Sequence, residues 1–323
     1  GMTRVSVLAV GGSALAKLGQ RGTLQEQVGN CKVFANVVSR FARTPSAFAP
    51  SASDRICIVH GNGPQVGNIE RQQEAFASEI PPFGLDCAVA MTQGSLGYLL
   101  GRELVNRFRT DKLELPVANI VTQVVVDRDD PACSTAVKPV GRYYTEDVAL
   151  QLQRELGWAM KPGPSGWRQI VPSPRPKQIL NLQILSSALS SSGILLAGGG
   201  GGIPVVENVD GDLEGLNAVI DKDFTAALVA QELNAGLLVL LTNAPKVCTD
   251  FGLSSEAPID RLTLQAAKSM LDEGQFLPGT MRPKMESAIH FLESSSDGEV
   301  LVCTADDLLN GDPATIGTRI TRE

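Results

Sequence analysis

Three lysines of this 323-residue chain lie in local sequences that set them apart from ordinary surface lysines. They are Lys138 in Val-Lys-Pro-Val-Gly (137–141), Lys222 in Val-Ile-Asp-Lys-Asp (219–223) and Lys284 in Gly-Thr-Met-Arg-Pro-Lys (279–284). Ammonium groups gathered around a phosphoryl group can neutralise its charge during transfer without forming a covalent bond to it. Lysine is seldom buried unless it is paired, so on spacing alone each could equally be a solvated side chain.

Three glycine-rich turns offer a second means of binding an anion. Each follows a short apolar segment, and they are Gly11-Gly12, Gly61-Asn62-Gly63 and the run of five glycines at 198–202. Unshielded backbone N–H groups and the amino ends of the helices that follow favour negative charge. One glycine pair after a strand is more often only a tight turn, but three in one chain favour an anion site, without saying which anion.

Several familiar phosphate and metal motifs are missing from the sequence. GxxxxGK[ST] does not occur, which excludes a P-loop, and GxGxxG does not follow the first apolar segment, which disfavours a dinucleotide fold. The six cysteines are scattered singly, with no CxxC pair and no neighbouring histidine, so neither a zinc site nor a disulfide framework is indicated. We therefore expect buried, reduced cysteines and a cytoplasmic protein.

The elements that must position these residues are short strands that alternate with helical periodicity. We predict strands at 5–10, 56–59, 118–126, 194–197, 237–241 and 300–303. The first, second and fourth of them end in the glycine turns. Such alternation predicts a mainly parallel sheet with helices on both sides, which binds its ligands at the carboxyl ends of the strands.

Two stretches interrupt this pattern. Residues 44–53 are rich in Pro, Ser and Ala and are expected to form an exposed connection. Residues 129–177 contain seven of the 19 prolines, both tryptophans and two of the three tyrosines. This abrupt change of composition indicates a lid or a small subdomain that projects from the sheet.

The overall composition is that of a globular protein with a sizeable core. Hydrophobic residues make up 43% and charged residues 20%, and the formal net charge of −7 argues against binding to nucleic acid or to an anionic membrane. No apolar run approaches the ~20 residues of a membrane span, and the run at 5–10 is too short for the core of a signal peptide. We expect a soluble protein.

Seven segments together resemble the motifs of the carbamate kinases, in the order in which that family carries them. They are Gly-Gly-Ser-Ala-Leu (11–15), His-Gly-Asn-Gly-Pro-Gln-Val-Gly (60–67), Met-Thr-Gln-Gly with Gly-Tyr (91–94 and 97–98), Lys-Pro-Val-Gly-Arg (138–142), Val-Pro-Ser-Pro-Arg-Pro (171–176), 199–204, and Ala-Val-Ile-Asp-Lys-Asp (218–223). As a colinear set they could hardly arise by chance. The resemblance spans nearly the whole chain and implies reversible, magnesium-dependent phosphoryl transfer from ATP to carbamate, which gives ADP and carbamoyl phosphate.

The resemblance also implies roles for individual residues. Lys138, Lys222 and Lys284 match the lysines around the transferring phosphoryl group, and Asp221 would orient them. The acceptor and the γ-phosphate would be held by Gly11, Gly12, Ser13, Gly61, Asn62 and Gly63. The nucleotide would be held by Thr242, Asn243, Val247, Gly279 and Met281. Mg2+ would be bound by the phosphates of ATP or ADP. Water would supply its remaining ligands, without a dedicated protein site.

The fold implied by the resemblance agrees with the pattern of elements. It is α/β, a three-layer α/β/α sandwich of the amino-acid-kinase type, with a central mostly parallel eight-stranded sheet and a small projecting subdomain. Residues 1–323 would form a single domain with an N-terminal lobe for the acceptor (about 1–205, including the subdomain at about 129–177) and a C-terminal lobe for the nucleotide (about 206–323). The resemblance also implies a homodimer.

The sequence departs from the family pattern at three places. Ser13 stands where the family usually has asparagine, Arg282 stands where a small residue is usual, and residues 243–247 differ from the usual acidic and aliphatic segment. Serine lacks the reach and the second donor of an amide, which leaves open another small acid as the acceptor. The other alternative is a nucleotide-binding relative without turnover, and the retained lysines argue against it.

Overall fold

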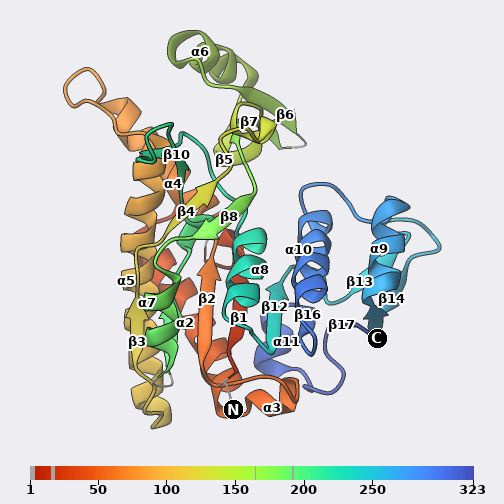
Figure 1. Ribbon diagram of the computed structural model, residues 1–323. Coiled ribbons are helices and arrows are strands. Elements are labelled where there is room, and N and C mark those ends of the chain that lie inside the picture. Colours follow the sequence, from red (N-terminus) through yellow and green to blue (C-terminus); the bar gives the residue numbers. More distant parts are fainter. Residues whose placement is uncertain (1–3, 16–18, 164, 191–192) are drawn as a thin grey trace.

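An eight-stranded sheet lies at the centre of the computed structural model, which describes residues 4–15, 19–163, 165–190 and 193–323 (Figure 1). Its strands, in spatial order, are β15 (Arg261–Thr263), β17 (Thr318–Thr321), β16 (Glu299–Cys303), β12 (Leu237–Leu241), β1 (Ser6–Val10), β2 (Ile56–His60), β9 (Ile194–Leu196) and β3 (Val117–Asn119). Neighbouring strands are parallel except for β16 and β17. The predicted mostly parallel eight-stranded sheet is confirmed.

The central strands β1, β2 and β12 are buried along their whole length. In β1, Val7 and Ala9 pack into one hydrophobic core, whereas Leu8 and Val10 pack into the other. The same alternation continues in β2 and β12. Because successive side chains of a strand point to opposite faces, a sheet covered on both faces requires continuous apolar runs such as these.

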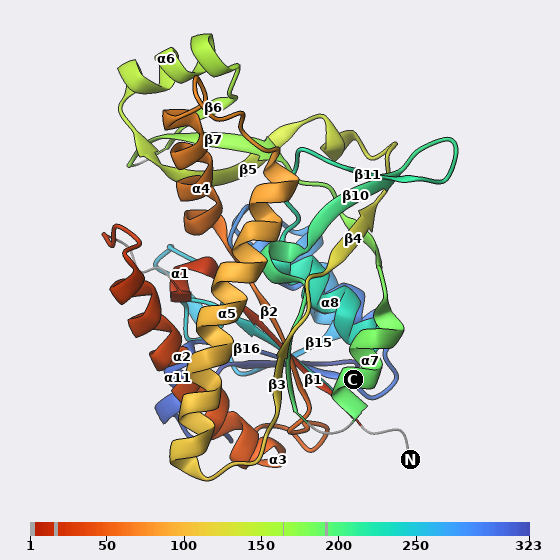
Figure 2. The ribbon, with the colours of Figure 1, turned by 90° about the vertical axis from the view of Figure 1, so that its left-hand side faces the viewer.

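Helices cover the two faces of the sheet and complete the predicted three-layer sandwich. Figure 2 shows α2 (Leu24–Arg43) and α5 (Leu85–Asp111) on one side, and α7 (Leu182–Ser190) and α8 (Lys222–Glu232) on the other. The core that contains Val7 and Ala9 also includes residues of α9 (Leu264–Asp272) and α10 (Met281–Ser294), and the core that contains Leu8 and Val10 includes residues of α11 (Ala305–Asn310). None of the helices that the structure describes is long and apolar enough to cross a membrane.

Residues 44–53 form a connection that is only partly exposed, whereas their composition predicts an exposed one. Pro45 begins the short helix α3 (Pro45–Phe48), and the Phe48 side chain is fully buried. Its ring centroid lies 5.1 Å from that of Phe41 on α2. The burial of this ring outweighs the local preference of a Pro- and Ser-rich segment for an open loop.

The run 118–126 forms two strands in different sheets rather than the single strand that we predict. Its second half is β4 (Gln123–Val126), which lies in a four-stranded sheet with β8 (Pro176–Ile179), β10 (Ile203–Glu207) and β11 (Leu213–Gly215). Between the two strands, the Thr122 N–H donates to the Gln93 side-chain oxygen at 2.8 Å instead of to a neighbouring strand. A contact from α5, distant in sequence, therefore ends the first strand.

The projecting subdomain consists of β5 (Ala136–Tyr144), α6 (Glu146–Leu156), β6 (Met160–Gly163) and β7 (Gly166–Pro172), and stands at the top of Figure 1. Its own core contains four buried residues, Tyr144, Ala149, Leu152 and Met160. It touches the main body through α4 (Gly63–Ala75), where a Cβ added to Gly67 would lie only 2.0 Å from the Gly141 Cα. The predicted subdomain is confirmed, and its backbone rests directly on that of α4.

Candidate active site

The carboxyl ends of β1, β2, β9 and β12 meet at one edge of the sheet. These strands are parallel neighbours, and Val10 at the end of β1 is paired with His60 at the end of β2. The Gly61 N–H donates to the Val10 carbonyl at 2.8 Å, so the turns after β1 and β2 lie side by side. The glycine run at 198–202 follows β9 at the same edge. The structure thus brings the three predicted glycine turns together.

The run of five glycines is required by its conformation and by its neighbours. Four of the five have positive φ, between 63° and 95°. A Cβ on Gly199 would lie 2.5 Å from the His60 ring, and one on Gly200 would lie 2.3 Å from the Asn62 amide. Only glycine accepts these angles and these contacts without displacement. Burial lowers the pKa of His60, whose Nδ1 lies 3.0 Å from the Gly61 carbonyl oxygen, which suits a neutral structural residue.

Two buried residues of α5 hold these turns in place. Asn62 donates to the Thr92 hydroxyl at 2.8 Å. The Gln93 amide donates to the Gly199 carbonyl at 2.9 Å, and its oxygen accepts the Thr122 N–H. Neither residue was assigned a role from the sequence, although both lie in the Met-Thr-Gln-Gly motif, which was the available signal. They are positioning residues for the turns.

The structure brings together the four residues predicted to handle the phosphoryl group. The Lys138 ammonium donates to Asp221 Oδ2. Asp223 Oδ2 accepts from Lys284 Nζ at 2.9 Å and lies 3.3 Å from Lys222 Nζ. Asp221 therefore pairs with only one lysine, and Asp223, which we did not predict, pairs with the other two. Three ammonium groups are held by two carboxylates.

The amino ends of two packed helices position this cluster. Asp221 is the N-cap of α8, where its Oδ1 accepts the Asp223 N–H at 3.0 Å, and Lys222 is the first residue of the helix. Lys284 lies in the first turn of α10, after Pro283, whose missing N–H costs little at such a position. The amino end of a helix carries partial positive charge, so both helix ends favour an anion nearby.

Burial and pairing act in opposite directions on these pKa values. Burial alone would raise the pKa of the Asp221 carboxyl, but the Lys138 and Lys222 ammonium groups outweigh it and lower that pKa. Burial would lower the pKa of Lys222, but Asp223 and Asp221 raise it. For Lys284 burial dominates, and Asp223 offsets it only partly, so its pKa is lowered. An anion that binds beside Lys284 would therefore favour its charged form.

A cavity of about 260 Å³ opens beside the Lys138–Asp221 pair. Its walls are Gly61, Asn62, Gly63, Pro64, Lys138, Pro139, Val140, Arg168, Gly200, Val219, Ile220, Asp221 and Lys222. The lining side chains include three cations and one carboxylate. The volume lies below the range of about 300–1,000 Å³ typical of drug-sized ligands, so the cavity suits a small anion. Arg168, which β7 of the subdomain supplies, was not predicted from the sequence.

Most of the predicted nucleotide-binding residues lie on neighbouring elements of the C-terminal half. Thr242 and Asn243 directly follow β12, and Gly279 and Met281 lie at the start of α10, all of them exposed or half-buried. Val247 differs, because its side chain is fully buried in the core at the start of β13 (Val247–Thr249). Its N–H donates to the Thr318 hydroxyl at 2.8 Å, so neither the side chain nor the N–H of Val247 is free to contact a ligand.

The remaining predicted residues lie at the start of the chain. Gly11 follows β1, and Gly12 and Ser13 open the short helix α1 (Gly12–Leu15). The side chain of Ser13 lies outside the described residues, so the predicted effect of serine at this position is not addressed by the structure. Arg282 is exposed, and its Nε donates to Glu286 one turn further along α10 at 2.8 Å.

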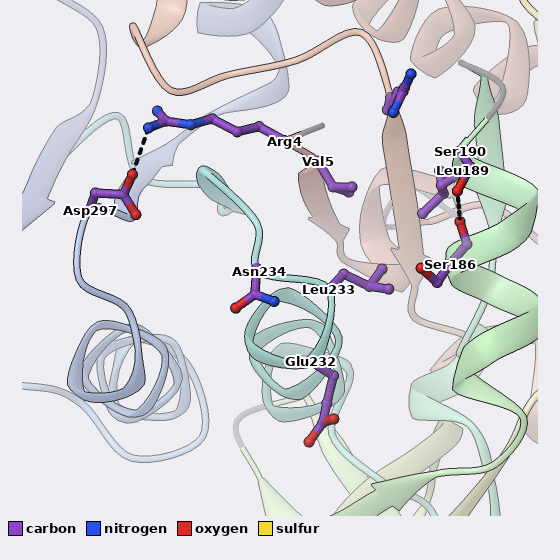
Figure 3. A pocket seen from close by; sticks show the side chains of 10 residues that line it. Arg4, Val5, Ser186, Leu189, Ser190, Glu232, Leu233, Asn234 and Asp297 are labelled. Atoms are coloured by element: carbon purple, nitrogen blue, oxygen red, sulfur yellow. Dashed lines mark hydrogen bonds and ion pairs between the residues drawn. The ribbon is translucent and has the colours of Figure 1, made fainter. Parts of the chain in front are cut away.

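A larger cavity, of about 660 Å³, lies at the opposite end of the strands (Figure 3). Its lining includes Val5, just before β1, and Arg4, which pairs with Asp297 at 2.6 Å. Ser190 donates to the Ser186 carbonyl on the same wall. Among the residues described there, none belongs to the glycine turns or to the lysine cluster. Size alone therefore does not identify the site.

The sheet topology, the glycine turns and the paired lysines define a class of phosphoryl-transfer fold, and comparison with known proteins agrees. The model of the amino acid kinase family matches residues 4–303, and the chain belongs to that family. Within it, a carbamate kinase of Thermococcus kodakarensis is 37% identical, with all of both chains covered. The solved structure of carbamate kinase from Giardia lamblia bound to citric acid has a TM-score of 0.87 at 29% identity, covering 99% of each chain. The structure of that enzyme bound to AMP-PNP has a TM-score of 0.84 at 30% identity, with the same coverage.

Proposed function

We propose that this protein is a carbamate kinase, which transfers a phosphoryl group reversibly between ATP and carbamate. Similarity to carbamate kinases over the full chain supports this proposal. The structural observation that carries it is the lysine cluster. Lys138, Lys222 and Lys284 come from three distant segments, yet Asp221 and Asp223 hold them beside the glycine turns.

In the proposed reaction, a carbamate oxygen bonds to the γ-phosphorus of ATP while the bond from that phosphorus to the β–γ bridging oxygen breaks. Lys222 and Lys284 offset the charge on the phosphoryl oxygens from the two helix ends, and Lys138 does so from the subdomain. Because carboxylates already fix these ammonium groups, little rearrangement is needed at the moment of transfer. Carbamate is anionic before it reacts, so no general base is required.

The acceptor would lie in the small cavity against backbone N–H groups. We assign its cradle to Gly11, Gly12, Ser13, Gly61, Asn62 and Gly63. Carbamate offers almost no apolar surface, so selection must come from a close fit that leaves no room for larger acids. The contacts that hold Asn62 and Gly199 rigid would maintain that fit.

The nucleotide would bind to the C-terminal half, about residues 206–323, and the acceptor to the N-terminal half, about 1–205. Thr242, Asn243, Gly279 and Met281 are the proposed contacts, with Val247 supporting them from the core. Mg2+, when bound with ATP, would neutralise part of the charge on the phosphates. In the described ranges no group of three or more His, Cys, Asp or Glu side chains is placed to hold a metal, and Asp221 and Asp223 are already paired with lysines. We propose that the phosphates and water supply the ligands of the ion.

We further propose that the protein is a cytoplasmic homodimer. All six cysteines are free, which suits a reducing compartment. The dimer is supported by the resemblance to the carbamate kinases. Light scattering of the purified protein tests it, and a mass close to the 34.2 kDa of one chain would contradict it.

The activity is tested by ATP formation from ADP, Mg2+ and carbamoyl phosphate, with acetyl phosphate as the comparison donor. We expect ATP from carbamoyl phosphate and little from acetyl phosphate. Equal or greater activity with acetyl phosphate would indicate another small acid as the acceptor. Binding of ADP without turnover would show that the protein is only a nucleotide-binding relative.

A further inference from the structure

Arg168 is a cation of the small cavity that has no carboxylate partner. Lys138 and Lys222 on the same wall pair with Asp221 and Asp223. By contrast, no Asp or Glu side chain of the described chain lies within ion-pair distance of the Arg168 guanidinium. Three ammonium groups and two carboxylates leave the cluster with one positive charge, and Arg168 adds a second. The cavity is therefore prepared for more negative charge than its own residues supply.

The donors of this guanidinium are only partly used. Nη2 donates to the Gly141 carbonyl at 2.8 Å. Nε is buried and has no hydrogen-bond partner among the described residues. A buried donor left unpartnered costs about 1–3 kcal/mol, and more when it is charged. An acceptor oxygen that enters with a ligand would remove this cost.

The guanidinium is also held in a defined position. Its Cζ lies 5.2 Å from the centre of the Tyr143 ring, and the Gly141 carbonyl fixes one end. A planar group with several parallel N–H donors matches the two oxygens of a carboxylate better than a lysine ammonium does. A guanidinium also matches phosphate oxygens, but in the proposed function the three lysines already face the phosphoryl group, which leaves the carboxylate oxygens of the acceptor for Arg168.

We infer that Arg168 is an acceptor-binding residue, which holds the carboxylate oxygen of carbamate that does not receive the phosphoryl group. This inference rests on the proposed function. In the reverse direction, an oxygen of the β-phosphate of ADP attacks the phosphorus of carbamoyl phosphate. The bond from phosphorus to the carbamate oxygen breaks, and carbamate leaves with the electron pair as an anion. Arg168 stabilises the charge that spreads over both oxygens of this leaving group, while the lysines stabilise the phosphoryl group.

Arg142 offers a matched control for this role. It lies on β5 of the same subdomain and its guanidinium covers Tyr144 at 5.1 Å, much as Arg168 covers Tyr143. It does not line the cavity. A variant of Arg142 therefore removes an arginine–tyrosine contact from the subdomain without removing a charge from the cavity wall.

The test compares Arg168→Met, Arg168→Lys and Arg142→Met with the unchanged protein in the ADP and carbamoyl phosphate assay. For Arg168→Met we expect KM for carbamoyl phosphate to rise about 10- to 100-fold, the factor that corresponds to one charge-assisted hydrogen bond, while KM for ADP changes less than about twofold. Arg168→Lys should recover part of the loss, because it keeps the charge without the planar donors. Arg142→Met should leave both constants unchanged. An Arg168→Met enzyme with an unchanged KM for carbamoyl phosphate, or with both constants raised equally, would overturn the inference.

A binding measurement separates this inference from the proposed function. Carbamoyl phosphate should raise the Tm of the unchanged protein and of Arg142→Met, but not that of Arg168→Met, whereas Mg2+ with ADP should raise all three. If the unchanged protein lacks turnover, the proposed function fails, yet a carbamoyl phosphate shift that depends on Arg168 would still support the inference. A shift that persists in Arg168→Met, or that is absent from the unchanged protein, would overturn it.

Discussion

The main body and the projecting subdomain supply the charges of the site in different ways. Lys222 and Lys284 stand on helices packed against a sheet whose central strands are fully buried, and the Lys284 side chain is only 9% exposed. Lys138 and Arg168 stand on strands of a subdomain whose own core has four residues, and the Lys138 side chain is 34% exposed. Small cores open locally at lower free-energy cost than large ones. This difference indicates that Lys222 and Lys284 are held rigidly, whereas the positions of Lys138 and Arg168 depend on how the subdomain packs against the main body.

Among the changes considered, Asp223→Asn should have the largest effect, because it removes the ion pairs that hold Lys222 and Lys284 in the main body. Lys222 and Lys284 would lose their shared carboxylate while remaining buried, and breaking a buried pair in this way costs about 3–5 kcal/mol. We expect the free energy of unfolding to fall by that order, which denaturant titration would measure. Asp260→Asn, at an exposed carboxylate paired with Lys246, is the control and should change stability by less than about 1 kcal/mol. Equal losses in both variants would show that the buried Asp223 contributes no more to stability than an exposed carboxylate does.

Lys222→Met should leave the fold intact and reduce turnover. Loss of one preorganised charge partner of the transition state typically costs 10²–10³-fold in kcat, or about 2.7–4 kcal/mol. We expect kcat for ATP formation to fall by that factor. Lys268→Met, at a half-buried lysine on α9 paired with Glu293, should retain normal kcat. A Lys222→Met enzyme with unchanged kcat would refute the role of the main-body lysines.

Gly67→Ala tests the seating of the subdomain. The added Cβ would meet the Gly141 backbone at 2.0 Å, so β5 must move away from α4. Overpacking of this kind costs about 1–3 kcal/mol. We expect KM for carbamoyl phosphate to rise more than KM for ADP, because Lys138 and Arg168 move with the subdomain while Lys222 and Lys284 stay.

Gly29→Ala on α2 is the control for this change, because its added Cβ would meet no atom within 4 Å. It should leave both KM values unchanged and should not destabilise the protein. If Gly67→Ala raises the KM of ADP as much as that of carbamoyl phosphate, the two halves of the site do not act separately.

Glu70→Gln should have the smallest effect and should depend on pH. Glu70 lies on α4, and burial raises the pKa of its carboxyl to about 7, with Gln169 of β7 and the nearby Glu74 as weaker influences. The folded protein thus keeps a proton that the unfolded chain releases near the ordinary value of 4.5, so this carboxyl lowers stability as pH rises from about 4.5 through 7. We expect Glu70→Gln to be more stable than the unchanged protein at pH 8, by on the order of 1–3 kcal/mol, and nearly equal to it at pH 5. An equal stability difference at both pH values would contradict this assignment.

The sheet could be predicted from sequence because its strands carry their own signals. The apolar runs that became β1, β2 and β12 are long, continuous and followed by turns, as a sheet covered on both faces requires. The two errors arose where a residue outside the segment decides the local structure. Phe48 is buried because it meets Phe41, and the run at 118–126 is broken because Gln93 binds Thr122.

The sequence predicted which residues belong to the candidate site, but not which lysine pairs with which carboxylate. The resemblance singled out the lysines and Asp221, and the structure places them together. It could not show that Lys284, from another helix, reaches Asp223 rather than Asp221. Arg168 lies on an ordinary strand between Trp167 and Gln169, with no local feature that marks it. Only the fold of the subdomain brings it to the cavity wall.

Asp223 interacts with two ammonium groups through the same oxygen atom, Oδ2. A bound phosphate that attracts Lys284 would leave Asp223 paired with Lys222 alone. When the phosphate leaves, Lys284 can pair with Asp223 again. In the ligand-free protein both ammonium groups therefore have a carboxylate partner. A bound phosphate competes with Asp223 for Lys284, rather than with water. We therefore expect nucleotide release to meet a smaller electrostatic barrier than three unshared lysines would impose.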